Sequence, residues 1–555
     1  MQDVITCSKE GPSERILRLR TRYQDEITTI SIQRAQHFTE KWFETEKEDL
    51  PLGKRVALSM KNVYEHMDHH VDPDDRIAGY WTESFLGMPL DVERGVFNNV
   101  VKTELKKSNF IKFKIGSSLK TFGYLLKKGQ LGNFLKNVKI MKSMGAMPIN
   151  MSLQTMDERE INPYTIAPGE RKILLEEILP RWKNKTIMDK LDAEIKKSDL
   201  IPGSILDFTM ALPANTSKQT LMVSPCSTIA RYQGHLINDF ETVLNDGLLE
   251  MKKKVDNEKK KTTKKDDLDF LESVKIALEG IIIYAERLAE SIERKMENEN
   301  DPERKEILSR MLENCRRVPL HPPETFYQAV QSAWTVKVAL ELAHPVNLQC
   351  FGRMDQLLFP YYKKDIDQGL ITPGEARELL EELLLKLMSL NIRPESNTLA
   401  NFYHRYLGST PVTIGGLKPD GTDGTNELTY LIIEAAQNAR AVTNISLRVT
   451  GDTPDDALLV AADALYNGSS NISFFNDEIA VEAMKRFGFS TEDARDYAVM
   501  GCVELVSQGK TGGMSANAML LCRLLDMTMR NGDALTMIGK IKGAGLKTGD
   551  PASFK

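Results

Sequence analysis

Four short apolar runs alternate with strong helix signals in the second half of the chain. The runs read HPVNLQCFG, PVTIGG, NISLRV and NISFF, at residues 344–352, 411–416, 444–449 and 471–475. Between the first two, TPGEARELLEELLLKLMSLN predicts a helix, because Thr372 and Glu375 form a capping box around Pro373 at the first helical position. Strands that alternate with helices build a sheet that is covered on both faces. The sequence therefore predicts an α/β fold with strands buried on both sides.

The composition of the 555-residue chain is typical of a globular protein that acts on small molecules. Hydrophobic residues make up 41% and charged residues 27%, and the net charge of -5 gives no general attraction to nucleic acid or anionic lipid. No apolar run approaches the roughly 20 residues that span a bilayer, and the N-terminus is too charged for a signal peptide. We therefore predict a cytoplasmic chain without nucleic-acid or membrane partners, organised as one domain over residues 1–555.

Two further segments, 111–145 and 167–182, are predicted to be helical. The first is basic and partly amphipathic, but Gly116, Gly123 and two later glycines interrupt its apolar face. A surface helix is therefore favoured over one that binds a membrane. The second, APGERKILLEEILPRW, again places a proline at a first helical position.

Three motifs that suggest ligand binding are weak on chemical grounds. The six cysteines are scattered without metal-ligand spacing, so neither a disulfide framework nor a cysteine-based metal site is predicted. The HMDHH motif places His66 one helical turn from His69 and His70, but it lacks the carboxylate base of a zinc hydrolase. The GKT at Gly509 is not a phosphate loop, because Glu504 stands where that loop needs a glycine and would repel phosphate.

The stretch GCVE around Cys502 gives the strongest chemical prediction. Ser490 and Asp493 predict the start of a helix and Gly501 ends the regular structure, so Cys502 is expected on a turn. Positions two apart in an extended turn point to the same side, which lets Cys502 and Glu504 face one cavity. A carboxylate raises the pKa of a neighbouring thiol and so disfavours thiolate catalysis. A neutral S–H suits hydrogen-atom transfer, with Glu504 as acid or base; a buried cysteine beside a surface acid is the alternative.

Around this stretch the sequence resembles the glycyl radical enzymes of the pyruvate formate-lyase-like superfamily. The resemblance extends, in the family's order from about Pro180, over the blocks ARYQGHLINDFETVLNDGL, CFGRMDQLLFPYYKKDIDQGLITPGEARELLEEL, VTIGGLKPDGTDGTNELTYLIIEAA and NISFFNDEIAVEAMKRFGFSTEDARDYAVMGCVE. It implies a ten-stranded α/β barrel of two parallel half-barrels surrounded by helices, with a helical N-terminal part. It also implies that Cys502 carries a thiyl radical and that Glu504 is the general base.

The resemblance further implies how the radical arises and which partners are needed. No organic cofactor is expected, because a protein-based glycyl radical, installed by a separate radical-SAM activating enzyme, would start the chemistry. A homodimer that acts on a small organic substrate is expected. The family carries its radical glycine near the C-terminus in a motif like R-V-x-G-Y, whereas RIAGY, residues 76–80, lies far N-terminal. We therefore expect a C-terminally incomplete domain that lacks the glycine radical domain and is inactive alone.

The residues near Cys502 also bear on the reaction. Val503 stands where the pyruvate formate-lyases proper have a second cysteine, so cleavage of a C–C, C–O or C–N bond is favoured over acyl transfer to coenzyme A. Aligned on the FGR that begins at Phe351, Asn347 and Gln349 lie in the block where diol dehydratases have G-H-S-V-S, and they are the predicted substrate contacts. Radical addition of the alkyl- or benzylsuccinate synthase type is an alternative that Glu504 disfavours. A partial subunit that needs a separate glycyl radical segment is another.

Overall fold

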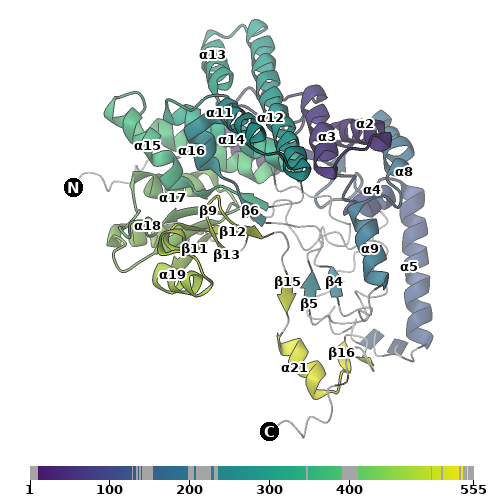
Figure 1. Cartoon of the computed structure of the whole chain (residues 1–555). Coiled ribbons are helices and arrows are strands. Elements are labelled where there is room, and N and C mark those ends of the chain that lie inside the picture. The colour runs from purple at the N-terminus through teal and green to yellow at the C-terminus, as the bar shows by residue number, and fades with distance from the viewer. Residues whose placement is uncertain are drawn as a thin grey trace. The chain divides into compact units, whose positions relative to one another are not determined.

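We analysed a computed structural model of the whole chain (Figure 1). It describes residues 11–127, 154–197, 205–207, 227–229, 235–345, 348–390, 410–469, 471–501, 503–513, 517–519, 521–536 and 539–541, with isolated positions between 129 and 139 and at 547. The chain divides into two compact units. The first comprises Met1–Pro89, His235–Ile392 and Tyr406–Gly513, and the second comprises Leu90–Gly234, Arg393–Arg405 and Met514–Lys555.

The first unit contains the parallel sheet that the apolar runs predict. Its order is β11-β10-β9-β8, with β8 at Gly352–Arg353, β9 at Val412–Gly415, β10 at Ile445–Val449 and β11 at Ile472–Asn476. β9 is buried throughout and β10 at all but its last residue, because helices cover both faces of a parallel sheet. The edge strand β11 departs from the expected double burial, since Phe474 is 45% exposed. The α/β prediction is confirmed for these strands.

Two short strand pairs complete the part of this unit that carries the site. β6 (His235–Ile237) lies parallel to β7 (Leu348–Cys350), and β14 (Gly512–Gly513) adds to β6 in the antiparallel direction. β12 (Tyr497–Met500) pairs with β13 (Glu504–Ser507) as an antiparallel hairpin. Figure 1 shows β6, β9, β12 and β13 in the same region of the molecule. Near the N-terminus, β1 (Thr28–Ser31) pairs in parallel with β2 (Gly87–Pro89).

Helices form the rest of the first unit. Before the sheet they are α1 (Glu14–Asp25), α2 (Gln33–Glu44), α3 (Leu52–His66), α11 (Phe240–Lys261), α12 (Lys265–Glu297), α13 (Pro302–Arg317) and α14 (Phe326–Ala343). Around and after it they are α15 (Met354–Asp367), α16 (Pro373–Ser389), α17 (Glu427–Ala439), α18 (Asp455–Tyr466), α19 (Asp477–Arg486) and α20 (Thr491–Arg495). The predicted capping box at the start of α16 is confirmed, since Thr372 and Glu375 each bond the other's main chain.

One local prediction is confirmed at its start but wrong in its extent. The helix that Ser490 and Asp493 begin is the short α20, which ends at Arg495, and the following residues form the buried strand β12. Arg448 of β10 accounts for the change, because its guanidinium donates to the main-chain oxygen of Tyr497 at 2.7 Å and pairs with Asp477 at 2.6 Å. At residues 497–500, contacts with distant strands therefore outweigh the local preference for helix.

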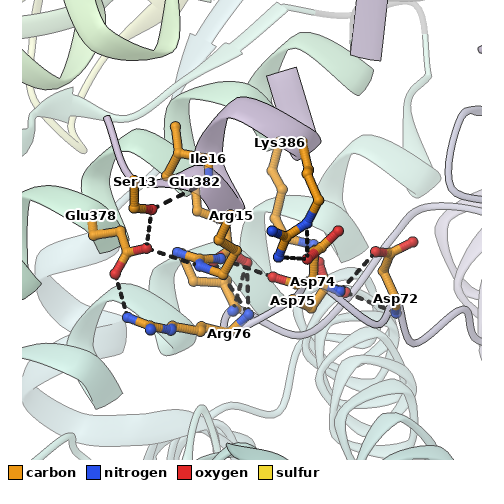
Figure 2. Close-up of polar contacts among 12 residues, drawn as sticks. Ser13, Arg15, Ile16, Asp72, Asp74, Asp75, Arg76, Glu378, Glu382 and Lys386 are labelled. Carbon is orange, nitrogen blue, oxygen red and sulfur yellow. Dashed lines mark hydrogen bonds and ion pairs between the residues drawn. The ribbon is translucent and has the colours of Figure 1, made fainter. Parts of the chain in front are cut away.

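Within the first unit, a network of ion pairs joins the N-terminal helix α1 to α16 (Figure 2). Arg15 binds Glu378 at 3.0 Å and Glu382 at 2.6 Å, both on α16. The RIAGY segment enters the same network, since the Arg76 and Ile77 amides donate to the Glu382 carboxylate. This segment therefore has a structural role in the described part of the chain.

The second unit is described in shorter pieces. Its helical elements are α4 (Asn98–Glu104), α5 (Lys107–Lys127), α7 (Pro168–Ile173), the π-turn η2 (Leu174–Ile178), α8 (Leu179–Arg181), α9 (Ile187–Lys197) and α21 (Leu521–Met529). Strand β5 (Ser227–Ile229) lies between the parallel β4 (Ile205–Asp207) and the antiparallel β15 (Asn517–Met519), and β16 (Ala534–Thr536) pairs with β17 (Gly539–Ile541). Both predicted segments contain the expected helices, α5 and α7 to α8, although Gly129, with φ +64°, forms a turn after α5. In the described part of the chain, no helix is long and apolar enough to cross a membrane.

Candidate active site

A histidine and a glutamate that are far apart in the sequence form the centre of the candidate site. His235, the first residue of β6, lies with Nδ1 2.6 Å from Oε1 of Glu504, the first residue of β13. The His235 side chain is 7% exposed, whereas the Glu504 side chain is 36% exposed. The pair therefore has a buried side that fixes its geometry and an open side that a small molecule can reach.

The turn between β12 and β13 presents this glutamate. Met500 and Glu504 pair across the hairpin, so only residues 501–503 connect the two strands. Gly501 has φ +58°, and the Val503 N–H donates to Glu504 Oε2 at 3.0 Å. Cys502 lies outside the described residues, but its described neighbours, Gly501 and Val503, form a turn, as predicted. Oε1 of Glu504 therefore contacts His235, and Oε2 accepts from the main chain of the turn that contains the predicted radical cysteine.

Gly501 is required for the close approach of these groups. A Cβ atom at this position would lie 2.2 Å from Nδ1 of His235 and 2.8 Å from Oε2 of Glu504. Both distances are shorter than van der Waals contact, and the positive φ is itself unfavourable for residues with a side chain. Only glycine therefore fits at position 501, next to the His235–Glu504 pair.

The hydrogen bonds hold Glu504 as a carboxylate. Burial alone would raise its pKa, but the bond from His235 and the bond from the Val503 amide outweigh burial and lower the pKa to about 2. Because an ionised carboxylate only accepts, the His235 Nδ1 must carry a proton and donate it. Glu504 is therefore charged near neutral pH and able to act as a base.

This lowered pKa predicts a pH-dependent contribution to stability. A carboxyl group with a depressed pKa stabilises the fold above its ordinary pKa of 4.5, and this contribution is lost as the pH falls through about 2. The difference in unfolding free energy between wild type and Glu504→Gln should be largest above pH 5 and should shrink toward pH 3. Urea unfolding across this range measures it. A difference that stays constant with pH would contradict the assigned carboxylate state.

The strand β7 lies next to the pair and contains the predicted contact Gln349. Its side chain is buried: Oε1 accepts from Asn238 at 3.0 Å, and Nε2 donates to the Leu340 oxygen at 2.7 Å. These bonds engage the amide within the protein, so substrate contact by Gln349 remains a prediction. The other predicted contact, Asn347, lies outside the described residues.

A second thiol lies directly beneath the turn. The Gly501 N–H approaches Cys350 Sγ at 3.4 Å, and Cys350 packs in an apolar cluster with Ile237, Met500 and Val506. Burial raises the pKa of this thiol to about 12, so it is neutral. Cys350 therefore supports the turn as a small apolar side chain with a weak acceptor atom.

The histidines of the HMDHH motif make their contacts away from this pair. His66 bonds the Asn62 oxygen, His70 bonds Asp72 at 3.2 Å, and His69 packs edge-on against Tyr284. Burial lowers the pKa of His69 to about 3, so that ring is neutral. In the described portion of the chain, no three or more His, Cys, Asp or Glu residues are grouped so as to hold a metal ion.

His235 is the site residue that the sequence analysis did not identify. It lies in the block ARYQGHLINDF, 269 residues before Glu504, and nothing local marks it as functional. Its position inside one of the resembling blocks is the signal that the sequence offered. Residues brought together from such distant segments by strand pairing are typical of active sites in α/β proteins.

The fold is an α/β fold, in which helices cover parallel strands. At the strand ends, His235 and Glu504 pair next to the turn that contains Cys502. The chain belongs to the pyruvate formate lyase-like family, whose model matches residues 9–122 and 129–555. This confirms the resemblance found in the sequence.

Named relatives lie within the same family. The chain is 29% identical to isethionate sulfite-lyase from Desulfovibrio desulfuricans over 97% of its own length and 59% of that protein. It is 29% identical to trans-4-hydroxy-L-proline dehydratase from Clostridioides difficile, over 73% of this chain and 50% of that protein. The chain thus spans about three fifths or less of the length of these two curated relatives.

Solved structures support the fold. A structure concerned with 1,2-propanediol dehydration in Roseburia inulinivorans superposes with a TM-score of 0.76 at 25% identity, covering 98% of this chain and 60% of that one. A glycyl radical enzyme from Archaeoglobus fulgidus gives a TM-score of 0.75 at 25% identity, covering 97% and 61%. The expected α/β barrel fold, surrounded by helices, is therefore confirmed.

Proposed function

We propose that this chain carries the thiyl and base residues of a glycyl radical lyase. The observation that supports it most is the 2.6 Å contact between His235 and Glu504 beside the Cys502 turn. Hydrogen-atom transfer needs a thiol that stays protonated at rest, and bond cleavage next to the resulting radical needs a base. The named relatives, a lyase and a dehydratase, are consistent with this division of roles.

Each residue has a distinct part in the proposed reaction. Cys502, as a thiyl radical, takes a hydrogen atom from one substrate carbon, and Glu504 takes a proton from a heteroatom on that carbon. The neighbouring carbon then loses its leaving group, and the Cys502 thiol returns the hydrogen atom to it. His235 orients the Glu504 carboxylate through Nδ1–H and stabilises its negative charge, so it supports the general base without taking the proton itself.

The source of the radical lies outside the described residues. A glycyl radical, installed by a separate radical-SAM activating enzyme, would supply the unpaired electron that converts the Cys502 thiol into a thiyl. The proposed substrate is a small organic molecule with a hydroxyl or amine on the carbon that loses hydrogen and a leaving group on the next carbon. A homodimer is the proposed assembly.

A substrate panel tests the proposal. An activated enzyme that contains residues 1–555 should be incubated without oxygen with isethionate, trans-4-hydroxy-L-proline or 1,2-propanediol, and the products identified by mass spectrometry. Cleavage of at least one compound, or of a close analogue, is expected. Formation of an adduct with fumarate instead of a cleavage product would contradict the lyase reaction and support radical addition.

Glu504→Gln should retain hydrogen abstraction but lose the base. We expect turnover to fall by about 10²–10⁴-fold, the usual contribution of a positioned general base. The matched control is Glu482→Gln, because Glu482 is an exposed glutamate on α19 that pairs only with Lys485 among the contacts described. This control should keep wild-type turnover. Equal turnover in Glu504→Gln and wild type would remove Glu504 from the mechanism.

A further inference from the structure

A buried ion pair on α14 lies under the site. The side chains of Lys337 and Glu341 are 0% and 1% exposed, and the Lys337 ammonium binds Glu341 Oε1 one helical turn away. A buried ion pair is often less favourable for stability than apolar residues of the same volume. The pair therefore calls for an explanation other than stability.

The ammonium has another partner, which is the main chain of β7. Lys337 Nζ donates to the Gln349 oxygen at 2.5 Å, and it lies 6.0 Å from the centre of the Phe351 ring that follows the strand. The Gln349 side chain returns to the same helix through its 2.7 Å bond to the Leu340 oxygen. Two hydrogen bonds therefore join Gln349 of β7 to α14: its main-chain oxygen accepts one from Lys337, and its side chain donates the other to Leu340.

β7 contacts both halves of the candidate site. His235 of β6 is the register partner of Leu348, and Ile237 is the partner of Cys350. Cys350 Sγ in turn accepts the N–H of Gly501, the residue before Cys502. A shift of β7 would therefore move His235 and the Gly501 turn relative to each other, and the close fit at Gly501 leaves little space for such a shift.

We infer that Lys337 is a positioning residue, whose ammonium holds β7 so that His235 and Gly501 keep their positions relative to Glu504. Glu341 keeps the ammonium oriented toward the strand. The charged groups that act on the Cys350 thiol at this place are Lys337, Glu341 and Glu504. The inference rests on the proposed function, because its consequence is a rate.

The test removes the whole pair, so that no unpaired charge stays buried. In activated enzyme, Lys337→Met/Glu341→Leu should lower kcat per glycyl radical by about 10–100-fold, since a small misplacement of reacting groups has effects of this size. The glycyl radical is quantified by electron paramagnetic resonance. Glu341→Gln keeps the bond from Lys337 to the Gln349 oxygen but removes the carboxylate that orients the ammonium, so its loss of kcat should be smaller than that of the double variant.

A second buried lysine provides the matched control. Lys386 lies 2.9 Å from Asp75, and their side chains are 1% and 0% exposed, within the network that fastens α1 (Figure 2). Lys386→Met/Asp75→Leu should change the melting temperature but leave kcat per radical unchanged. If the Lys337/Glu341 double variant fails to fold, Lys337→Gln/Glu341→Gln, which buries no charge and whose amide at position 337 is too short to hold the Gln349 oxygen, gives the same comparison.

Three results separate the possible failures. Wild-type kcat per radical in the Lys337 variants would overturn the positioning role and leave the proposed function intact. An equal loss in the Lys386/Asp75 control would also overturn it, since the effect would then belong to any buried pair. Wild-type turnover that survives Cys502→Ala would instead overturn the proposed function itself.

Discussion

Cys502→Ala is expected to abolish substrate turnover in the activated enzyme, with a loss of at least about 10⁴-fold, as for removal of an essential reacting side chain. Alanine has no sulfur to accept the substrate hydrogen atom, and neither Glu504 nor His235 can replace it. The glycyl radical should still form, because its installation does not need this thiol. Turnover and the radical signal, measured on one sample, therefore separate loss of chemistry from loss of activation.

Two other cysteines provide controls for this substitution. Cys315 is buried in the apolar cluster with Leu308 and Met311, and Cys522 is exposed on α21. Cys315→Ala and Cys522→Ala should keep kcat per radical, although the first should lower stability because it leaves a small cavity. Turnover that persists in Cys502→Ala, or an equal loss in Cys522→Ala, would show that Cys502 is not the reacting thiol.

Gly501→Ala is expected to lower turnover by about 10²–10³-fold. The added Cβ would lie 2.2 Å from Nδ1 of His235, so the histidine or the turn must move and the contact with Glu504 must break. Without that hydrogen bond, burial should raise the pKa of Glu504. The acidic limb of the pH–rate profile should therefore shift upward in this variant.

Gly369 is the matched control for the backbone effect of this substitution. It has φ +67°, close to the +58° of Gly501, but an added Cβ would meet nothing within 4 Å. Gly369→Ala should therefore lower stability by about 1–2 kcal/mol through backbone strain alone, with no change in turnover. If Gly501→Ala behaves like Gly369→Ala in both measurements, the close fit between Gly501 and the His235–Glu504 pair has no catalytic role.

The regular parts of the fold could be predicted from the sequence because their signals are local. The apolar runs became β7 to β11, and Thr372 with Glu375 caps α16 as expected. The short connection between β12 and β13 was also predictable, since Gly501 is a local signal for the end of a regular element. The resemblance added the α/β barrel and the role proposed for Glu504.

The remaining features depend on contacts between distant segments. β12 was predicted as helix because Ser490 is a good N-cap, but Arg448 of β10 binds the main chain at Tyr497 and the strand pairs with β13. His235 reaches Glu504 only because β6 and the hairpin meet. Lys337 could not be recognised as an interior residue from composition, because lysine is almost never fully buried unless it is paired.

The fate of the abstracted hydrogen atom tests the central claim most directly. A substrate identified in the panel should be deuterated at the carbon next to the one that loses the leaving group and converted by activated wild-type enzyme, with the product analysed by nuclear magnetic resonance. If Cys502 takes this atom and returns it to the neighbouring carbon, the deuterium will appear on the carbon that lost the leaving group, and the reaction will be slower than with hydrogen. Deuterium that stays at its original carbon, with an unchanged rate, would contradict hydrogen-atom transfer at this site.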